Sequence, residues 1–239
     1  GYMLETGPAL WSMGEHYRYT RDVAWVRRIQ KKVIKACDYL LAWRARNQRA
    51  DLRGKGYGLI DGKVADPEDH FRQFMLNGYS YVGIQRASEM LAAINPRESR
   101  RLAKEAVAWK QDIRKALAQC MAESPVIPVG DGTWAPTLPP WAEMRGPAAL
   151  YVNGELQFTH GTFTGRDSMI GPPYLFISEV IDPNEPMGEF LLKTHDELFT
   201  VNNGAFSQPY YARHDYAHLK RGETAAFLKL YYTTFSALA

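Results

Sequence analysis

Residues 57–80 read YGLIDGKVADPEDHFRQFMLNGYS, and this stretch organises the fold that we expect for the chain. Three carboxylates, Asp66, Glu68 and Asp69, follow one another closely in a polar approach to an apolar run. Beyond them, small and apolar residues recur at the spacing of one face of an α-helix. They are Leu76, Tyr79, Val82, Gly83, Ala87, Met90, Leu91 and Ile94. The stretch therefore predicts a packed helix with acidic residues at its start.

These acidic residues have two interpretations that are compatible with each other. In the structural one, Asp66 is the N-cap of the helix, Pro67 is its first residue, and Glu68 and Asp69 face the positive end of the helix dipole. In the functional one, a carboxyl group points into a cleft, where neighbouring negative charges and aromatic rings raise its pKa. One acid can cap the helix while another lines the cleft.

The rest of the chain shows helical periodicity seven more times. One helix opens at Pro8, a second is capped by Asp22 and runs to about Asn47, and another lies between Pro96 and about Glu123. Four more are expected, over about 168–181, 186–198, 208–221 and 223–239. A stretch dense in Pro and Gly, 124–167, carries two turn signals typical of β-hairpins, at 129–134 and 151–156.

The lengths of the connections predict how these eight helices are arranged. Short links join the first helix to the second, the third to the fourth, the fifth to the sixth, and the seventh to the eighth. The other three links are longer, at about 20, 45 and 10 residues against a usual 4 to 6. The pattern predicts an all-α fold of antiparallel helical hairpins, with small β-hairpin excursions in the long loops. All the long loops would then lie on one face.

We expect 1–239 to form a single domain of about four hairpins that is incomplete at both ends. The last helix runs to the final residue without a capping signal, and the first begins close to the N-terminus. Arrays of hairpins need neighbours or closure to cover their outer faces. A fragment of a longer array, or a homo-oligomer, would provide that cover.

Charge and cysteine usage narrow the function classes. The formal net charge is +3, and Lys and Arg alternate with Asp and Glu along the helices, so no nucleic-acid partner is expected. No run of 18 apolar residues is present, so we expect no membrane partner. Cys37 and Cys120 both fall on apolar helix faces and lack the spacing of a metal site or a disulfide framework. The sequence gives no indication of the compartment.

Several short sequence motifs in the predicted hairpins carry a family resemblance. They are Gly-Leu-Ile at 58–60 leading to Asp66-Pro67-Glu68-Asp69, then Asn-Gly-Tyr-Ser at 77–80, with weaker support from 206–214 and 219–232. In these motifs the chain resembles the six-hairpin (α/α)6-toroid glycosidases, a group that includes the glucoamylase-like enzymes. The resemblance implies a partial (α/α)6 toroid that holds hairpins two to five.

The same resemblance implies a glycoside hydrolase that works without a cofactor. In the glucoamylase-like enzymes the general acid lies in the loop before the third inner helix, and Glu68 is the best match to it. The Trp-Glu-Glu form common in that group is absent here, so the choice among Asp66, Glu68 and Asp69 stays open. No residue matches the general base of the family.

An oligosaccharide or polysaccharide substrate would need further contacts on the long-loop face. Aromatic rings stack on sugars, which makes Trp134 and Tyr210 candidates, with Trp141 a weaker one. The polar candidates are Arg72, Gln208 and His214. His214 and His218 share a helix face, but no third metal ligand is evident, so capping or hydrogen bonds between helices are the favoured roles.

Two other classes of function compete with hydrolysis. A polysaccharide lyase on a related toroid would abstract a proton beside a uronate, for which Tyr210, His214, Asn202 and Arg213 are candidates. A non-catalytic helical array would use the acids at 66–69 only as a helix cap.

Overall fold

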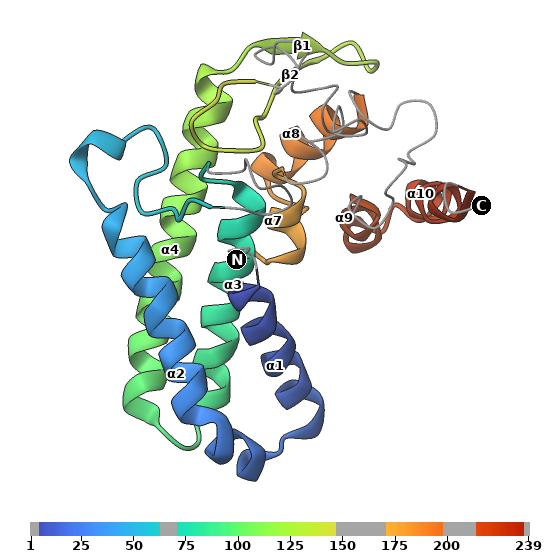
Figure 1. Cartoon of the computed structure of the whole chain (residues 1–239). Helices are drawn as coiled ribbons and strands as arrows, with labels where there is room; N and C mark the ends of the chain where they lie inside the picture. Colours follow the sequence, from blue (N-terminus) through green and yellow to red (C-terminus); the bar gives the residue numbers. More distant parts are fainter. Residues whose placement is uncertain (1–4, 63–70, 147–170, 198–213, 237–239) are drawn as a thin grey trace. The chain divides into compact units, whose positions relative to one another are not determined.

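The computed structural model describes residues 5–62, 71–146, 171–197 and 214–236 (Figure 1). The described residues are mostly helical, with one two-stranded antiparallel sheet, which confirms the predicted all-α class. Two compact units divide the chain, an N-terminal unit Gly1–Ala116 and a C-terminal unit Leu117–Ala239. Their arrangement as parts of an (α/α)6 ring within one domain stays a prediction. Among the described helices, none combines the length and the apolar character needed to cross a bilayer.

The N-terminal unit is built from two antiparallel helical hairpins. Helices α1 (Thr6–Thr20) and α2 (Val23–Arg46) form the first, and α3 (Phe74–Leu91) and α4 (Pro96–Glu123) form the second. The last seven residues of α4, 117–123, belong to the C-terminal unit. Figure 1 shows both short turns at one end of this unit and the long connection from α2 to α3, with its 3₁₀ turn η1 (Ala50–Leu52), at the other end. The predicted pairing of these four helices is confirmed.

The start of α2 shows why its boundary was predictable from the sequence. Asp22 lies at the N-cap position, and its Oδ1 accepts a hydrogen bond from the backbone N–H of Trp25 at 2.8 Å. This bond satisfies one of the amide groups that the first turn of a helix leaves without a partner.

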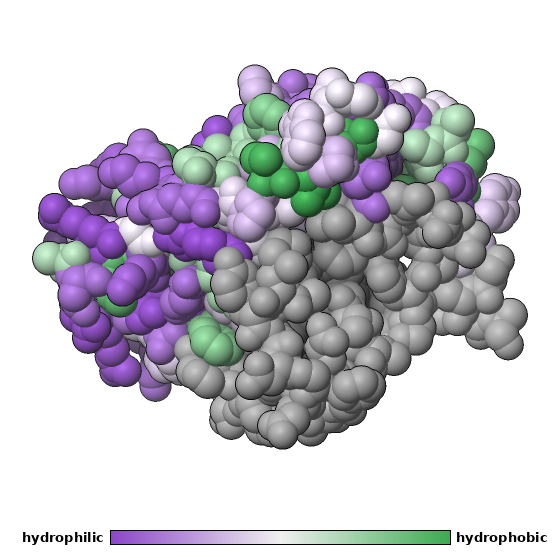
Figure 2. Space-filling model, turned by 90° about the horizontal axis from the view of Figure 1, so that it is seen from above, coloured by the Kyte–Doolittle hydropathy of each residue, from purple (hydrophilic) through white to green (hydrophobic). Residues whose placement is uncertain are grey.

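The long connection that follows α2 is strongly hydrophilic on its outer side. Figure 2 shows polar side chains gathered there (purple, left). The exposed polar residues of this stretch are Gln48, Arg49, Asp51, Arg53 and Lys55. Charged groups remain hydrated at this end of the unit, while Leu59 and Ile60 behind them are fully buried.

Helix α3 is the centre of the N-terminal unit. Fifteen of its eighteen residues are buried, so the helix is covered on all sides rather than on one stripe. Glycines let α1 approach it closely: a Cβ at Gly83 would lie 2.5 Å from the carbonyl oxygen of Gly7, and one at Gly14 would lie 2.2 Å from the Cβ of Arg86. The two helices therefore meet nearly backbone to backbone.

The predicted start of α3 is wrong. The helix begins at Phe74, and its N-cap position is Gln73 rather than Asp66. The physical reason lies in burial, because Phe74, Met75, Leu76 and Asn77 form a first turn that is buried throughout. Charged first-turn residues such as Glu68 and Asp69 would lose their hydration at that position.

The C-terminal unit contains shorter elements. A hairpin of β1 (Val126–Pro128) and β2 (Trp134–Pro136) pairs Ile127 with Ala135. Its turn confirms the signal at 129–134, while the signal at 151–156 lies outside the described residues. The helices are α7 (Tyr174–Ile177), α8 (Pro186–His195), α9 (His214–Arg221) and α10 (Thr224–Ser236).

One sequence expectation for this unit needs correction. The helix expected over 168–181 is reduced to the single turn α7, because Gly171-Pro172-Pro173 cannot extend it backwards. On α8, Phe190 is exposed. On α10, Leu228, Tyr231 and Phe235 are exposed, and Leu230 is the residue that turns inward.

Candidate functional sites

A polar cluster lies where the connection from α2 approaches α3, and its centre is Asp61. The carboxylate Oδ1 of Asp61 accepts hydrogen bonds from the indole Nε1 of Trp43, at 3.1 Å, and from the amide Nδ2 of Asn47, at 2.8 Å. The end of α2 thus holds one oxygen of this side chain with two donors.

These donors also set the ionisation of Asp61. Burial alone raises the pKa of the carboxyl group, but the hydrogen bonds from Asn47 and Trp43, with the charge of Arg72 nearby, outweigh it. The pKa of Asp61 therefore lies below its ordinary value, and the group is a carboxylate at neutral pH.

The backbone that carries Asp61 is fixed by Asn77, a fully buried residue of α3. The Asn77 amide accepts from the N–H of Ile60 at 2.8 Å and donates to the carbonyl of Ile60 at 2.9 Å. Trp109 of α4 donates its indole N–H to the same amide oxygen at 3.1 Å. Three segments distant in sequence are therefore joined at one side chain next to Asp61.

The two residues that flank 63–70 are joined directly. The N–H of Gly62 donates to the carbonyl of Phe71 at 3.3 Å. Next along the chain, Arg72 donates from Nη2 to the Oδ1 of Asn47 at 3.3 Å, so this predicted site residue belongs to the Asp61 cluster. The side-chain amide of Gln73 is fully buried, and no described residue hydrogen-bonds to it.

Five of the other site residues predicted from the sequence lie outside the described residues. They are Asp66, Glu68, Asp69, Gln208 and Tyr210.

Trp134, on β2, is 63% exposed and available for contact, whereas Trp141 is only 3% exposed and so belongs to the core. His214 is the first residue of α9, for which only the backbone is described. Asp61 lies within residues 57–80, but the sequence did not indicate it as a site residue, because its hydrogen-bond donors come from the end of a helix that stops 15 residues earlier.

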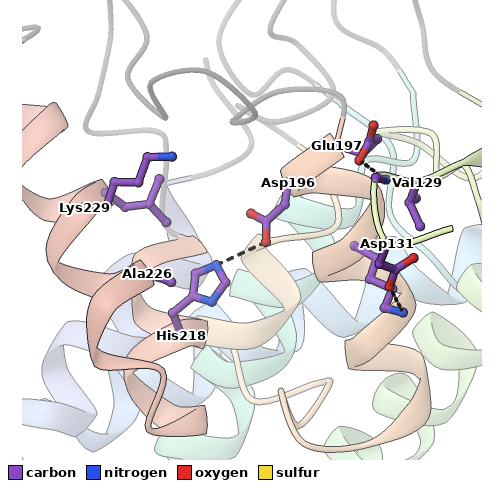
Figure 3. Close-up of a pocket in the computed structure, with 10 residues that line it drawn as sticks. Val129, Asp131, Asp196, Glu197, His218, Ala226 and Lys229 are labelled. Carbon is purple, nitrogen blue, oxygen red and sulfur yellow. Dashed lines mark hydrogen bonds and ion pairs between the residues drawn. The ribbon is translucent and has the colours of Figure 1, made fainter. Parts of the chain in front are cut away.

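A cavity of about 400 Å³ lies in the C-terminal unit (Figure 3). Its walls come from the β1–β2 turn, the end of α8, and helices α9 and α10. The charged residues that line it are Asp131, Lys193, Asp196, Glu197, His218 and Lys229, and the apolar ones include Val129, Ala226 and Leu230. None of the charged residues was singled out as a substrate contact from the sequence.

On one side of the cavity the charges neutralise one another. Asp131 Oδ2 accepts from the ammonium of Lys193 at 2.8 Å, and its Oδ1 accepts from both the N–H and the hydroxyl of Thr133. These bonds hold the pKa of Asp131 well below its usual range.

On the other side, His218 lies between two carboxylates. Its Nδ1 is 2.6 Å from Glu223 Oε2, and its Nε2 is 3.4 Å from Asp196 Oδ2. Burial alone lowers the pKa of this imidazole, but the hydrogen bonds to Asp196 and Glu223 outweigh it and raise the pKa. The sequence analysis favoured hydrogen bonds over metal binding for His218, and the contacts with Glu223 and Asp196 agree with that prediction.

Two further residues, Arg221 and His195, interact with these charged groups. Arg221 donates to Glu223 at 2.7 Å and pairs with Glu189 at 2.7 Å. Complete burial, aided by the nearby charge of His218, lowers the pKa of His195 to about 3, so this imidazole is neutral. Within the described part of the chain, no group of three or more His, Cys, Asp or Glu side chains is placed to hold a metal ion.

No family model, no curated protein and no solved structure matches this chain.

Proposed function

We propose that this chain takes part in the cleavage of glycosidic bonds, with Asp61 as the ionised carboxylate and one of Asp66, Glu68 and Asp69 as the proton donor. The observation that carries the proposal is the state of Asp61. It is held as a carboxylate by two donors from the end of α2, directly beside the joined residues Gly62 and Phe71 that flank the acidic segment.

Glycoside cleavage needs two carboxyl groups in opposite protonation states. One must donate a proton to the leaving oxygen, and the other must be ionised so that it can activate water or attack the sugar. Asp61 has the second property because Trp43 and Asn47 stabilise its charged form. Glu68 is the preferred proton donor, because it best matches the acid of the glucoamylase-like enzymes that this sequence resembles.

The side chains around Asp61 also suit a ligand rich in hydroxyl groups. A fully buried amide that lacks a hydrogen bond costs about 1 to 3 kcal/mol for each unsatisfied group, so Gln73 favours a binding partner outside the described residues. Its amide offers both donors and an acceptor, the combination that sugar hydroxyls can use. Arg72 adds further donors at the same cluster.

The test is sugar release from a panel of oligosaccharides and polysaccharides by the full-length protein. We expect Asp61→Asn to lower kcat by about 10² to 10⁴, the usual contribution of a general acid or base. Asp51→Asn is the matched control, because Asp51 lies in the same connection but is exposed and, among the described residues, its carboxylate pairs with Arg49 alone. A corresponding loss in Glu68→Gln, but not in Asp66→Asn, would assign the proton donor.

Three outcomes would contradict the proposal. Full activity in Asp61→Asn would remove Asp61 from the mechanism. Unsaturated products that absorb in the ultraviolet would indicate a polysaccharide lyase instead. Binding of glycans with no turnover on any member of the panel would indicate a non-catalytic binding protein.

A further inference from the structure

We propose that the cavity of the C-terminal unit binds a small zwitterion, a molecule that carries one ammonium and one carboxylate group. The inference does not depend on the activity proposed above, which uses residues of the N-terminal unit. The cavity, at about 400 Å³, falls in the size range of small-molecule sites. The charged groups in its walls differ in whether they already have partners.

Most of the charges that line the cavity are already paired. Lys193 is bound by Asp131, at 2.8 Å, and His218 lies between Asp196 and Glu223. Such groups gain little from a ligand, because binding it would first require an existing ion pair to open. These paired groups form the walls of the cavity, and we do not expect them to provide the main contacts with a ligand.

Two groups of opposite charge remain with unused capacity. Lys229 of α10 forms no hydrogen bond or ion pair with any described residue, and Figure 3 shows its side chain reaching toward the cavity. Glu197, just after α8, accepts a hydrogen bond from the N–H of Gly130 at 2.9 Å through Oε2. Its Oε1 receives none from the described residues, so one oxygen is fixed in place and the other is available.

Lys229 and Glu197 come from opposite sides of the cavity in Figure 3. Their charged atoms do not form an ion pair, so they do not satisfy each other, and the cavity lies between them. A ligand with only a negative charge would meet Lys229 but also the carboxylates Glu197 and Asp196. A ligand with only a positive charge would meet Glu197 but also Lys229 and His218. A molecule with both charges satisfies both ends without repulsion.

The middle of the cavity suits the spacer of such a molecule. Val129, Ala226 and Leu230 contribute apolar surface between the charged walls. Methylene groups between an ammonium and a carboxylate would bury part of their area there. The ligand class is therefore an amino acid with the two charges separated by a short aliphatic chain.

The experiment uses a series of ω-amino acids as a ruler: glycine, β-alanine, 4-aminobutyrate, 5-aminovalerate and 6-aminohexanoate. Binding to the full chain is measured by calorimetry and by the NMR signals of the His218 ring, which lines the cavity. We expect one length to bind best, with a Kd of about 30 mM, the scale for two partly exposed charge pairs. The ligand of that length should bind at least fivefold more tightly than the matching alkyl amine or alkyl carboxylate.

Variants locate the site. We expect Lys229→Gln and Glu197→Gln each to weaken binding of the best zwitterion about fivefold, and 0.5 M salt to weaken it as well. Lys220→Gln, at the exposed end of α9, is the control and should bind as the unaltered protein does. The proposal is overturned if the zwitterions bind no better than their singly charged analogues, if no length is preferred, or if neither variant weakens binding.

Discussion

The two units of this protein differ in the length of their helices and in how deeply their ion pairs are buried. The N-terminal unit uses helices of 15 to 28 residues and a central helix, α3, that is buried on all sides. The C-terminal unit uses helices of 4 to 13 residues joined by ion pairs, such as Lys193 with Asp131 and Arg221 with Glu189 and Glu223. The N-terminal unit also has ion pairs between helices, but its Arg44 and Arg86 are almost fully buried, whereas Lys193 and Arg221 of the C-terminal unit are partly exposed.

Each unit is therefore vulnerable to different changes. Close packing is disturbed by the addition or removal of single groups but is insensitive to salt. Ion pairs near the surface weaken as ionic strength rises, and those that involve histidine change with pH. We expect these differences to be visible in four experiments.

The largest expected effect is on the reactivity of the two cysteines, one in each unit. Burial raises the pKa of both Cys37 and Cys120 to about 12, against an ordinary value of 9.0. The thiolate population in the folded protein is then about a thousandfold smaller, and both thiols should resist alkylation at pH 8. As urea is added, we expect Cys120 to be alkylated at a lower concentration than Cys37. Simultaneous labelling would show that the two units do not differ in stability.

The next largest effect is expected at Asn77. Asn77→Ala leaves the N–H and carbonyl of Ile60 and the indole N–H of Trp109 without their partner in a buried place. The free energy of unfolding of the N-terminal unit should fall by about 3 kcal/mol or more. Ser88→Ala is the control on the same helix, because it removes a single hydrogen bond to the carbonyl of Ser99. Equal losses in the two variants would contradict a special role for Asn77.

A third test addresses the close approach of α1 and α3. Ala is favoured over Gly inside a helix by about 1 kcal/mol, so Gly83→Ala ought to stabilise an isolated α3. In this structure the added Cβ would meet the backbone carbonyl of Gly7, and we expect a net loss of about 2 kcal/mol in urea unfolding. Ala9→Val, on the exposed side of α1, adds bulk without a clash and should cost only a few tenths of a kcal/mol. Any stabilisation by Gly83→Ala would refute the close approach.

The smallest effect, about 1 kcal/mol, concerns pH and the C-terminal unit. The pKa of His218 is raised in the folded state, because hydrogen bonds to Asp196 and Glu223 outweigh burial. A group with a raised folded pKa stabilises the fold below its unfolded pKa of about 6.5, and that contribution is lost as pH rises through the folded value. The urea midpoint of the C-terminal unit should therefore be lower at pH 9 than at pH 6.

His218→Gln should remove most of this pH dependence, whereas His16→Gln, an exposed residue of the N-terminal unit, should leave it intact. An NMR titration that places the pKa of His218 below 6.5 would contradict the assignment.

The sequence predicted the long helices well, because periodicity over 24 to 28 residues leaves few alternatives. Asp22 and Pro96 marked helix starts by local chemistry, and both are confirmed. Asp66 and Pro67 carried the same local signal without starting α3. There the burial of the whole first turn decided the boundary, and burial is a tertiary property.

Sites were harder to predict than helices for the same reason. The acidic residues at 66–69 were visible as a cluster, but the ionised state of Asp61 depends on Trp43 and Asn47, which lie in another element. The cavity of the C-terminal unit draws its walls from residues as far apart as Val129 and Leu230. No spacing rule joins positions separated by about a hundred residues, so only the structure can bring them together.

The burial of α3 on all sides also has a consequence for synthesis of the protein on the ribosome. Trp109 and Lys110 of α4, which contact Asn77 and Tyr81 of α3, are translated after α3 is complete. At 5 to 20 residues per second, the 25 residues between Leu91 and Ala116 take about one to five seconds. During that interval the nascent chain displays a helix that is apolar around much of its circumference, and we expect chaperones that bind such segments to hold it until α4 emerges.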